Sequence, residues 1–275
     1  MEKAIFTRLT DDPIVMVDHE PIVKFDQHGR HTLDDPIVKE LRANLIINEE
    51  LYISMMALPQ DFNELAVGFM FAEGLITSYD DIVSIESTCT GNIFVETVNP
   101  VHRDEDDKRV MVSGCGSGTV SLAFLNELGL PTLVSDQTYA YSEIIAMMKV
   151  FNKQSPIFNE AGGCHSAALR FKDGTDIFFE DIGRHNAVDK VVGRAIMEGR
   201  TIQDCALLVS GRISSEIVLK TIKLGIPVLI SQSGPTAMSL ALAKKTQMTL
   251  LGFARAFRFN VYSGAERIVD DREPS

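Results

Sequence analysis

One cysteine stands in a glycine-rich stretch near the middle of the chain, within MVSGCGSGTV at residues 111–120. Cys115 lies between Gly114 and Gly116, and Gly118 follows two residues later. Glycine gives the backbone unusual freedom, and the N–H groups of such a loop stabilise negative charge. A cysteine reacts as its thiolate, and a thiolate attacks sulfur. These residues predict a reactive cysteine in a flexible loop, which is suited to sulfur chemistry.

A second set of residues, suited to binding, follows three apolar segments in the second half of the chain. CALLVS (205–210), PVLIS (227–231) and MTLLGFA (248–254) are predicted strands, and helices are predicted after the first two. Residues that follow parallel strands meet at one edge of the sheet, where ligands bind. The residues are Ser210, Gly211, Arg212, Ser214, Ser215, Ser231, Gln232, Ser233, Gly234, Thr236, Arg255, Arg258 and Asn260.

This set predicts a site for a phosphorylated or nucleotide-like ligand. Helix N-termini favour anions, small residues allow close approach, and the forked donors of arginine suit phosphate. The alternative interpretation is ordinary capping of helices by serine, threonine and glycine.

Two further segments concentrate polar residues. EDIGRHNAVDK (180–190) lies between an apolar strand and a helix, and includes Arg184 and His185. It is either catalytic or ligand-positioning, or a helix cap with an internal ion-pair network. In AGGCHSAAL (161–169), His165 precedes a predicted strand. A lone histidine is more often structural, and the glycine pair beside this one adds some weight to a functional role, so both interpretations stay open.

The other cysteines and histidines give no metal signature. The chain has four cysteines and no C-x-x-C pair, so zinc-ribbon and thioredoxin-type motifs are absent. A zinc deaminase would show H-x-E and later P-C-x-x-C, whereas Ala167 stands two residues after His165. Cys89 and Cys205 are interpreted as packing residues, whereas the sequence assigns no single role to Cys164. The remaining histidines are expected at the surface: His19, His28, His31 and His102.

Composition describes a globular chain rather than a nucleic-acid or membrane protein. The 275 residues are 45% hydrophobic and 23% charged, with a formal net charge of −12. This charge argues against general nucleic-acid binding. The N-terminus has no apolar signal core, and no run approaches the roughly 18 apolar residues of a membrane span. We expect a cytoplasmic protein with reduced thiols.

The order of elements predicts two domains. The first half is mixed: a strand at 51–58, a helix that starts with a capping box at Asp61 and Glu64 and stops at Gly74, and a strand pair from NIFVETVNP and KRVMVSG. The second half alternates strands and helices, with a hairpin turning at Asp173–Gly174, and predicts a mostly parallel sheet. We expect an α+β domain over 1–135 that carries the Cys115 loop, and an α/β domain over 136–275.

Together these motifs resemble the FdhD/NarQ family, the formate dehydrogenase accessory sulfurtransferases. The resemblance begins at LPQDFNELAVGFMFAEGLI and rests on long, ordered matches. These are GGCHSAAL, FEDIGRHNAVDK, VSGRISSEIVLK, GIPVLISQSGPT and LLGFARAFRFNVY.

The resemblance implies a sulfur carrier. Such proteins accept sulfur from a cysteine desulfurase as a cysteine persulfide and deliver it to a bis(molybdopterin guanine dinucleotide) cofactor before its insertion into formate dehydrogenase. It also implies a cytidine-deaminase-like three-layer αβα domain without zinc, and a homodimer. The persulfide cysteine of the family matches Cys115. The cofactor-binding segment matches Phe253, Ala254, Arg255, Ala256, Phe257 and Arg258.

The chain departs from the family in its cysteine loop. Many members carry C-G-x-C-G, whereas this chain has Cys115 followed by glycine, serine and Gly118. We align Cys115 with the first cysteine, because Gly116 then keeps its place; the other register leaves Val112 at the first. In either register, a relay between two loop cysteines is not available.

Three hypotheses about function follow. In the first, the Cys115 thiolate carries sulfur to the bound cofactor. In the second, the protein is a cofactor-binding chaperone of the apo-dehydrogenase without thiol chemistry. The third and weaker one is a nucleotide-modifying enzyme on a deaminase-like scaffold.

Overall fold

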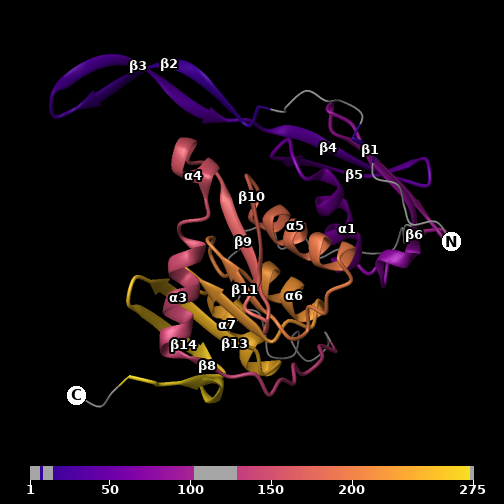
Figure 1. Cartoon of the computed structure of the whole chain (residues 1–275), viewed down its shortest axis with the longest axis vertical. Coiled ribbons are helices and arrows are strands. Elements are labelled where there is room, and N and C mark those ends of the chain that lie inside the picture. Colours follow the sequence, from indigo (N-terminus) through magenta and orange to yellow (C-terminus); the bar gives the residue numbers. More distant parts are fainter. Residues whose placement is uncertain (1–6, 9–14, 102–128, 273–275) are drawn as a thin grey trace. The chain divides into compact units, whose positions relative to one another are not determined.

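A computed structural model describes residues 7–8, 15–101 and 129–272 (Figure 1). The chain divides into two compact units, each made of separate stretches. Unit one contains residues up to Val101 together with Lys153–Ser166 and Phe179–Met197. The described part of unit two consists of residues 129–152, Ala167–Phe178 and 198–272.

Unit one is built on a five-stranded sheet in the order β1-β6-β7-β4-β5. Its strands are β1 (Thr7–Arg8), β4 (Leu41–Ile47), β5 (Glu50–Ala57), β6 (Ile82–Ser87) and β7 (Asn92–Thr97). β4 and β5 form an antiparallel hairpin, and β4 pairs with β7 in parallel. Asn48 and Glu49 turn the hairpin with φ of 49° and 70°, since positive φ at both turn residues matches the twist of the strands.

Two helices of unit one cross with their backbones in close contact. These are α1 (Phe62–Ala72) and α5 (Arg184–Met197). A Cβ atom placed on Gly68 would lie 1.8 Å from the Asp189 carbonyl oxygen, and one on Gly193 would lie 1.9 Å from the Glu64 carbonyl oxygen. Only glycine fits at either position. The contact between α1 and α5 explains why the 179–197 stretch belongs to unit one.

The core of unit one lies between α1 and the sheet. Leu45, Ile85 and Ile93 of the sheet and Leu65 and Met70 of α1 are fully buried in one cluster. α1 ends at Ala72, and Gly74, the stop that the sequence predicts, follows the C-cap Glu73 with φ of 73°. The predicted capping box is wrong: Asp61 has left-handed backbone angles and makes no side-chain cap, while Glu64 pairs with Arg194. A 3₁₀ turn, η1 (Tyr79–Asp81), precedes β6.

A long two-stranded hairpin also belongs to unit one. β2 (Val17–Asp26) and β3 (Gly29–Val38) pair antiparallel over their whole length. Figure 1 shows this hairpin as a ribbon that extends away from β4 and β5. The short helix α4 (Pro156–Ala161) contacts β3.

Unit two is built around a six-stranded sheet in the order β10-β9-β11-β12-β13-β14. The strands are β9 (His165–Arg170), β10 (Asp176–Asp181), β11 (Ala206–Val209), β12 (Val228–Ser231), β13 (Thr249–Arg255) and β14 (Arg258–Ser263). β11, β12 and β13 are parallel neighbours, whereas β9 and β14 run antiparallel to β11 and β13. The sheet is therefore mixed, and the predicted parallel order holds only at its centre.

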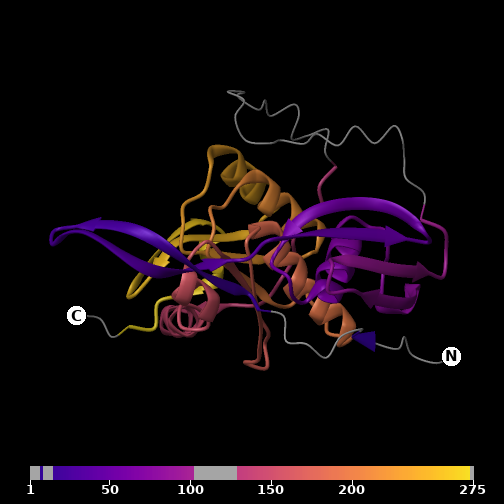
Figure 2. The same cartoon turned by 90° about the horizontal axis from the view of Figure 1, so that it is seen from above.

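Helices cover both faces of this sheet. α3 (Tyr141–Phe151) lies on one side, and α6 (Ser215–Lys223) and α7 (Ala237–Lys245) lie on the other (Figure 2). The α3 side forms one buried cluster, made of Ile144, Met147, Met148, Phe151, Ala168, Ala206, Leu208, Val228, Ile230 and Leu251 among others. Leu207, Leu229 and Leu250 alternate with these strand residues and are equally buried, since successive strand side chains point to opposite faces.

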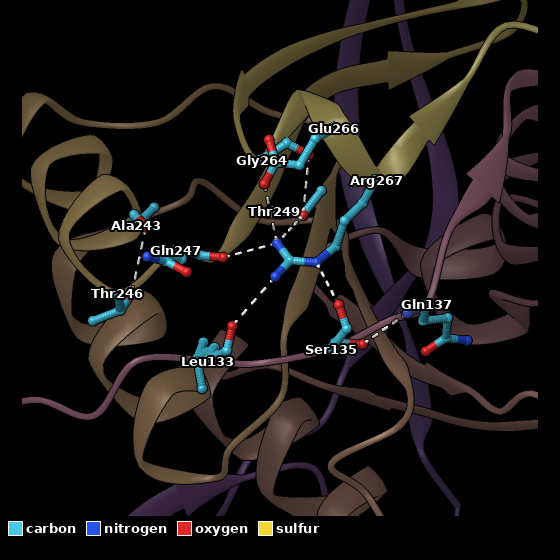
Figure 3. Close-up of polar contacts among 10 residues, drawn as sticks. All are labelled: Leu133, Ser135, Gln137, Ala243, Thr246, Gln247, Thr249, Gly264, Glu266 and Arg267. Atoms are coloured by element: carbon cyan, nitrogen blue, oxygen red, sulfur yellow. Dashed lines mark hydrogen bonds and ion pairs between the residues drawn. The ribbon is translucent and has the colours of Figure 1, made fainter.

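Arg267 ties together the edge of unit two from which the parallel strands start (Figure 3). It follows β14 in the 3₁₀ turn η2 (Ala265–Arg267), next to β15 (Ile268–Val269), which pairs with β8 (Tyr139–Ala140). Its guanidinium donates to the carbonyl oxygens of Leu133, Ser135 and Gln247 at 3.3, 3.2 and 2.9 Å, and to Thr249 Oγ1 at 3.0 Å. These bonds hold the segment before β8 against the start of β13.

The structure changes several sequence-based expectations. The compact units are discontinuous, because α5 packs against α1, and the expected domain division at residue 135 stays a prediction. β7 pairs with β6, which was not predicted, while the predicted partner KRVMVSG lies outside the described residues. Among the helices in the described ranges, none is both long and apolar enough to cross a bilayer.

Candidate functional site

The loops after β11 and β12 of unit two are joined to each other. Ile213 and Pro235 form an isolated parallel bridge. The Ile213 amide donates to the Gly234 carbonyl at 3.2 Å, and the Thr236 amide donates to the Ile213 carbonyl at 3.1 Å. The residues predicted to gather at this edge of the sheet therefore do so in these two loops.

Ser231 holds the two loops together from inside. Its hydroxyl donates to the Gly211 carbonyl at 2.7 Å and accepts from the Ser233 amide at 2.9 Å, and the residue is fully buried. The Gln232 amide adds a bond to the Val209 carbonyl at 3.3 Å. The buried Ser231 hydroxyl therefore fixes the conformation of the two loops. Ser210 and Ser233, by contrast, are half-buried.

The two helices that follow are capped by the chain itself. Ser214 Oγ accepts from the Ile217 amide at 3.4 Å at the start of α6. Thr236 and Ser239 form a reciprocal capping box at the start of α7. Both features predicted from the sequence are thus present: the loops converge at one edge, and their hydroxyl groups also serve as ordinary caps.

The hairpin between β13 and β14 contributes the third part of the edge. Arg255 and Arg258 pair across it, and Ala256, with φ of 49°, makes the turn. Arg255 Nε donates to the Gln232 carbonyl at 3.0 Å, which fixes the start of the hairpin against the β12 loop. Phe257 at the tip is 82% exposed.

Exposure separates the predicted binding residues into two groups. Gly211, Ser231 and Ala254 are buried. The cations and the aromatic rings are exposed: Arg212, Phe253, Arg255, Phe257 and Arg258. Exposed guanidinium groups next to aromatic rings suit a ligand that carries both phosphates and planar bases.

The EDIGRHNAVDK segment forms an internal network in unit one. Asp181 is fully buried and accepts from Lys190 Nζ at 2.7 Å, from the Leu58 and Gly183 amides at 3.1 and 2.9 Å, and from Asn186 Nδ2 at 2.8 Å. Asn186 Nδ2 also donates to the Met56 carbonyl at 2.8 Å. Asp181, Asn186 and Lys190 therefore form an internal network, which is the structural one of the two interpretations of this segment.

The groups around this network have shifted pKa values. Burial raises the pKa of Glu180, whose carboxylate accepts from the Ile157 and Phe158 amides of α4. Burial, reinforced by Glu180 and Asp181, raises the pKa of Cys164 to about 12. Burial, and then the charge of Arg184, lowers the pKa of His165.

The supporting residues predicted from the sequence lie in unit one. His165, Arg184 and His185 are all half-buried there. The predicted phosphate-type loops and the FARAFR segment lie in unit two.

The cysteines differ in accessibility. Cys115 lies outside the described residues. Cys89 is exposed, so its interpretation as a packing residue is wrong. Cys205 is buried, and its Sγ donates to the Ile202 carbonyl at 2.8 Å, while burial raises its pKa. Within the described ranges, no group of three or more His, Cys, Asp and Glu residues is placed to hold a metal ion.

Sequence reasoning missed one residue that shapes this edge of unit two, Tyr141 of α3, which holds the tip of the hairpin. Gly234, which belongs to the predicted binding set, lies beneath the Phe253 ring, a contact that the sequence did not predict. Gln232 Nε2 also donates to Asn152 Oδ1, just past the end of α3. No local sequence pattern predicts these contacts, because the residues that make them are distant from one another in the sequence.

A layered α/β unit whose loops gather at the carboxyl edge of its central strands has the arrangement in which open α/β sheets bind ligands. Residues 38–269 match the FdhD/NarQ family. The chain belongs to the FdhD/NarQ family.

Relatives from several bacteria support this assignment. A protein of Listeria monocytogenes serotype 4b, strain F2365, named sulfur carrier protein FdhD, is 33% identical over 260 residues, which is 92% of this chain and 99% of the relative. Proteins of the same name from Bacillus subtilis and Staphylococcus aureus strain MRSA252 are 33% and 35% identical, covering 89% and 92% of this chain and 95% and 97% of their own length.

A solved structure has a similar fold. The crystal structure of a Desulfotalea psychrophila protein, provisionally described as a formate dehydrogenase accessory protein, aligns with a TM-score of 0.75 and 28% identity. The alignment covers 93% of this chain and all of the other.

Proposed function

We propose that this protein is a sulfur carrier for the maturation of formate dehydrogenase. In this proposal Cys115 accepts sulfur from a cysteine desulfurase as a persulfide and passes it to a bis(molybdopterin guanine dinucleotide) cofactor. The cofactor is the substrate that receives sulfur, and it is then inserted into the dehydrogenase. Family membership over residues 38–269 is the observation that carries the proposal.

The first step is a thiol–persulfide exchange. The Cys115 thiolate attacks the outer sulfur of the desulfurase persulfide, a new S–S bond forms, and the desulfurase cysteine leaves as a thiolate. The outer sulfur keeps its proton or yields it to water, and no external oxidant or reductant is needed. A glycine-flanked cysteine favours this step, since neighbouring backbone N–H groups stabilise the attacking thiolate.

The carboxyl edge of unit two suits the substrate. A molybdopterin guanine dinucleotide carries pyrophosphates and guanine bases, and the edge exposes Arg212, Arg255 and Arg258 beside Phe253 and Phe257. Guanidinium groups bind phosphate oxygens through paired donors, and aromatic rings stack with bases. The net charge of −12 over the whole chain discourages nonspecific binding of other polyanions.

Mapping the persulfide tests the sulfur-transfer step. The chain is incubated with a cysteine desulfurase and cysteine, and modified cysteines are located by mass spectrometry. We expect a mass increase of one sulfur atom at Cys115 that disappears in Cys115→Ala. Cys89→Ala is the matched control, because Cys89 is the exposed cysteine among those that the structure describes. Equal persulfide formation in Cys115→Ala would show that the carrier cysteine is another residue.

A second test addresses the binding segment. Replacing Arg255 and Arg258 by alanine together should weaken GDP binding, measured by calorimetry, by about tenfold or more. The matched control is Lys24→Ala with Arg30→Ala, which removes the same charge from the β2–β3 hairpin. Unchanged affinity in the first variant would remove the segment from the site.

A cofactor-binding chaperone without thiol chemistry is the second candidate function. The absence of a second loop cysteine, with Gly118 in its place, favours it. The two candidates differ in cells that carry only the Cys115→Ser variant. Sulfur transfer predicts inactive formate dehydrogenase there, whereas a chaperone would leave maturation intact.

The proposal includes a setting for this function. Unit two is proposed to be a cytidine-deaminase-like three-layer domain that acts without zinc, and the protein is proposed to work as a cytoplasmic homodimer. Sedimentation of the purified chain tests the dimer, and a monomer at all concentrations would contradict it.

A further inference from the structure

Phe253 has a backbone conformation that its side chain disfavours. Its φ is +51°, within the left-handed region where bulky residues are rare. The strand is bulged there, because Gly252 pairs with Asn260 and Arg255 with Arg258, which leaves two residues of β13 opposite one of β14. Bulges next to binding sites often redirect a side chain.

The surroundings hold this conformation in place. The Phe253 amide donates to the Ser233 carbonyl at 3.1 Å. A Cβ atom on Gly252 would lie 2.9 Å from the Ser233 carbonyl oxygen, so the bulge and the β12 loop are in backbone contact. A strained residue persists only where its neighbours fix it, and such residues cluster at ligand sites.

Gly234 gives the ring of Phe253 its place. A Cβ atom on Gly234 would lie 2.6 Å from Phe253 Cζ and 3.0 Å from Cε2. The far end of the ring therefore rests on the β12 loop at a point where any side chain would displace it. The ring remains 40% exposed at the edge that carries Arg255.

We propose that Gly234 is a positioning residue, and that with the left-handed backbone of Phe253 it sets the Phe253 ring as a platform on which a guanine base stacks. This inference deepens the proposed function and rests on it, since that function supplies the guanine nucleotide. A ring held in place before binding loses little conformational entropy when the ligand arrives. Arg255, whose Nε donates to the Gln232 carbonyl of the β12 loop, supplies the neighbouring cation that this proposal assigns to the phosphates.

The experiment compares side chains that strain the backbone equally but differ in their π-face. GDP binding to the full chain is measured by calorimetry for Phe253→Tyr and Phe253→Leu. Base–aromatic stacking predicts that tyrosine retains affinity within about threefold and that leucine loses about tenfold or more. Equal GDP affinities for these two variants would contradict the proposal that the Phe253 ring stacks on the guanine base.

Two further variants separate positioning from folding. Gly234→Ala should weaken GDP binding about as much as Phe253→Leu, and the double variant should lose no more than either alone, because both act through the same ring. Additive losses would overturn the role of Gly234. The thermal unfolding midpoint of each variant should lie within a few degrees of that of the parent. If a variant that loses GDP affinity also unfolds at a much lower temperature, its loss of binding counts against a positioning role.

The matched control for strain is Gln247, an exposed non-glycine residue of unit two that lies outside the β13–β14 hairpin and also has a positive φ, 58°. Gln247→Gly should relieve strain without changing GDP affinity, whereas Phe253→Gly should relieve strain and lose affinity. If the parent chain binds no guanine nucleotide, the proposed substrate class fails together with the platform. If the parent binds GDP and every Phe253 variant binds equally, only the platform fails.

Discussion

The phenolic hydroxyl of Tyr141 donates a hydrogen bond to the main-chain carbonyl of Phe257 at 2.6 Å. Tyr141 is the first residue of α3, and Phe257 lies at the tip of the β13–β14 hairpin. The Tyr141 ring also packs near Phe259, with centroids 5.7 Å apart, and beneath the Arg272 guanidinium at 4.4 Å. α3 therefore restrains the most exposed part of the proposed binding edge.

Tyr141→Phe should loosen this tip without disturbing the packing of the ring. A neutral hydrogen bond of this kind contributes about 0.5–1.5 kcal/mol, so we expect a small loss of stability and faster amide exchange in residues 255–258. GDP affinity should fall a few-fold. The control is Tyr262→Phe, the same change in β14 away from the tip. Hydrogen exchange measured by mass spectrometry checks both, and equal exchange at the tip in both variants would contradict the restraint.

Lys190→Met should strongly destabilise unit one. Lys190 and Asp181 are both fully buried, and removal of one partner leaves the other charge without its counterion. Breaking a buried pair in this way costs about 3–5 kcal/mol. The control, Lys172→Met, breaks an exposed pair with Asp204, for which we expect less than about 1 kcal/mol. Urea denaturation, with amide exchange in α5 as the local probe, measures both, and similar losses would contradict the role of burial.

Gly193→Ala should prevent the close approach of α1 and α5. The added carbon would lie 1.9 Å from the Glu64 carbonyl oxygen, so the helices must separate. Overpacking typically costs about 1–3 kcal/mol, and we expect a loss of about 3 kcal/mol here because the added carbon meets backbone atoms. Ala195→Gly in the same helix is the control without an added atom: it lowers helix propensity by about 1 kcal/mol and removes one buried methyl group worth about 0.8 kcal/mol. Thermal unfolding compares them, and a Gly193→Ala variant as stable as the parent would contradict the geometry.

The thiols should differ sharply in reactivity. Burial raises the pKa of Cys164 to about 12, so at pH 8 only about one molecule in 10⁴ carries its thiolate. Raising the pH towards 12 should therefore speed its alkylation, since the thiolate is the reactive form. On the folded chain at pH 8, iodoacetamide should modify Cys89 and spare Cys164 and Cys205. After unfolding all should react, and mass spectrometry identifies them. Equal rates for Cys89 and Cys164 in the folded chain would contradict this difference.

Local signals in the sequence predicted most elements of unit two. The Asp173–Gly174 turn and the alternation of apolar segments with capped helices depend on neighbouring residues, so they are readable without the fold. The carboxyl-edge loops followed from the same alternation. The direction of β9 and β14, by contrast, depends on which strands they pair with, and no residue within them encodes this.

Contacts between distant residues account for what the sequence did not predict. Gly68 and Gly193 stand inside helices, where a glycine suggests only a weak position, yet they allow two backbones to touch. Phe253 resembles any apolar strand residue, although its backbone is left-handed. Asp61 resembles an N-cap, but its partner Glu64 is drawn to Arg194 on another helix.

Arg267→Lys should release the segment that enters unit two before β8. Lysine keeps the charge but offers a single ammonium group, whereas the guanidinium reaches Leu133, Ser135, Gln247 and Thr249 at once. Each carbonyl left without its donor in this buried setting costs about 1 kcal/mol or more, so we expect a total loss of about 2–4 kcal/mol. Amide exchange should rise at Leu133, which donates to the Thr246 carbonyl at 2.8 Å. Arg272→Lys is the control, since Arg272 is exposed at the C-terminal end of the described chain and should tolerate the change. If exchange at Leu133 stays the same in Arg267→Lys, the segment must be held by contacts other than this guanidinium.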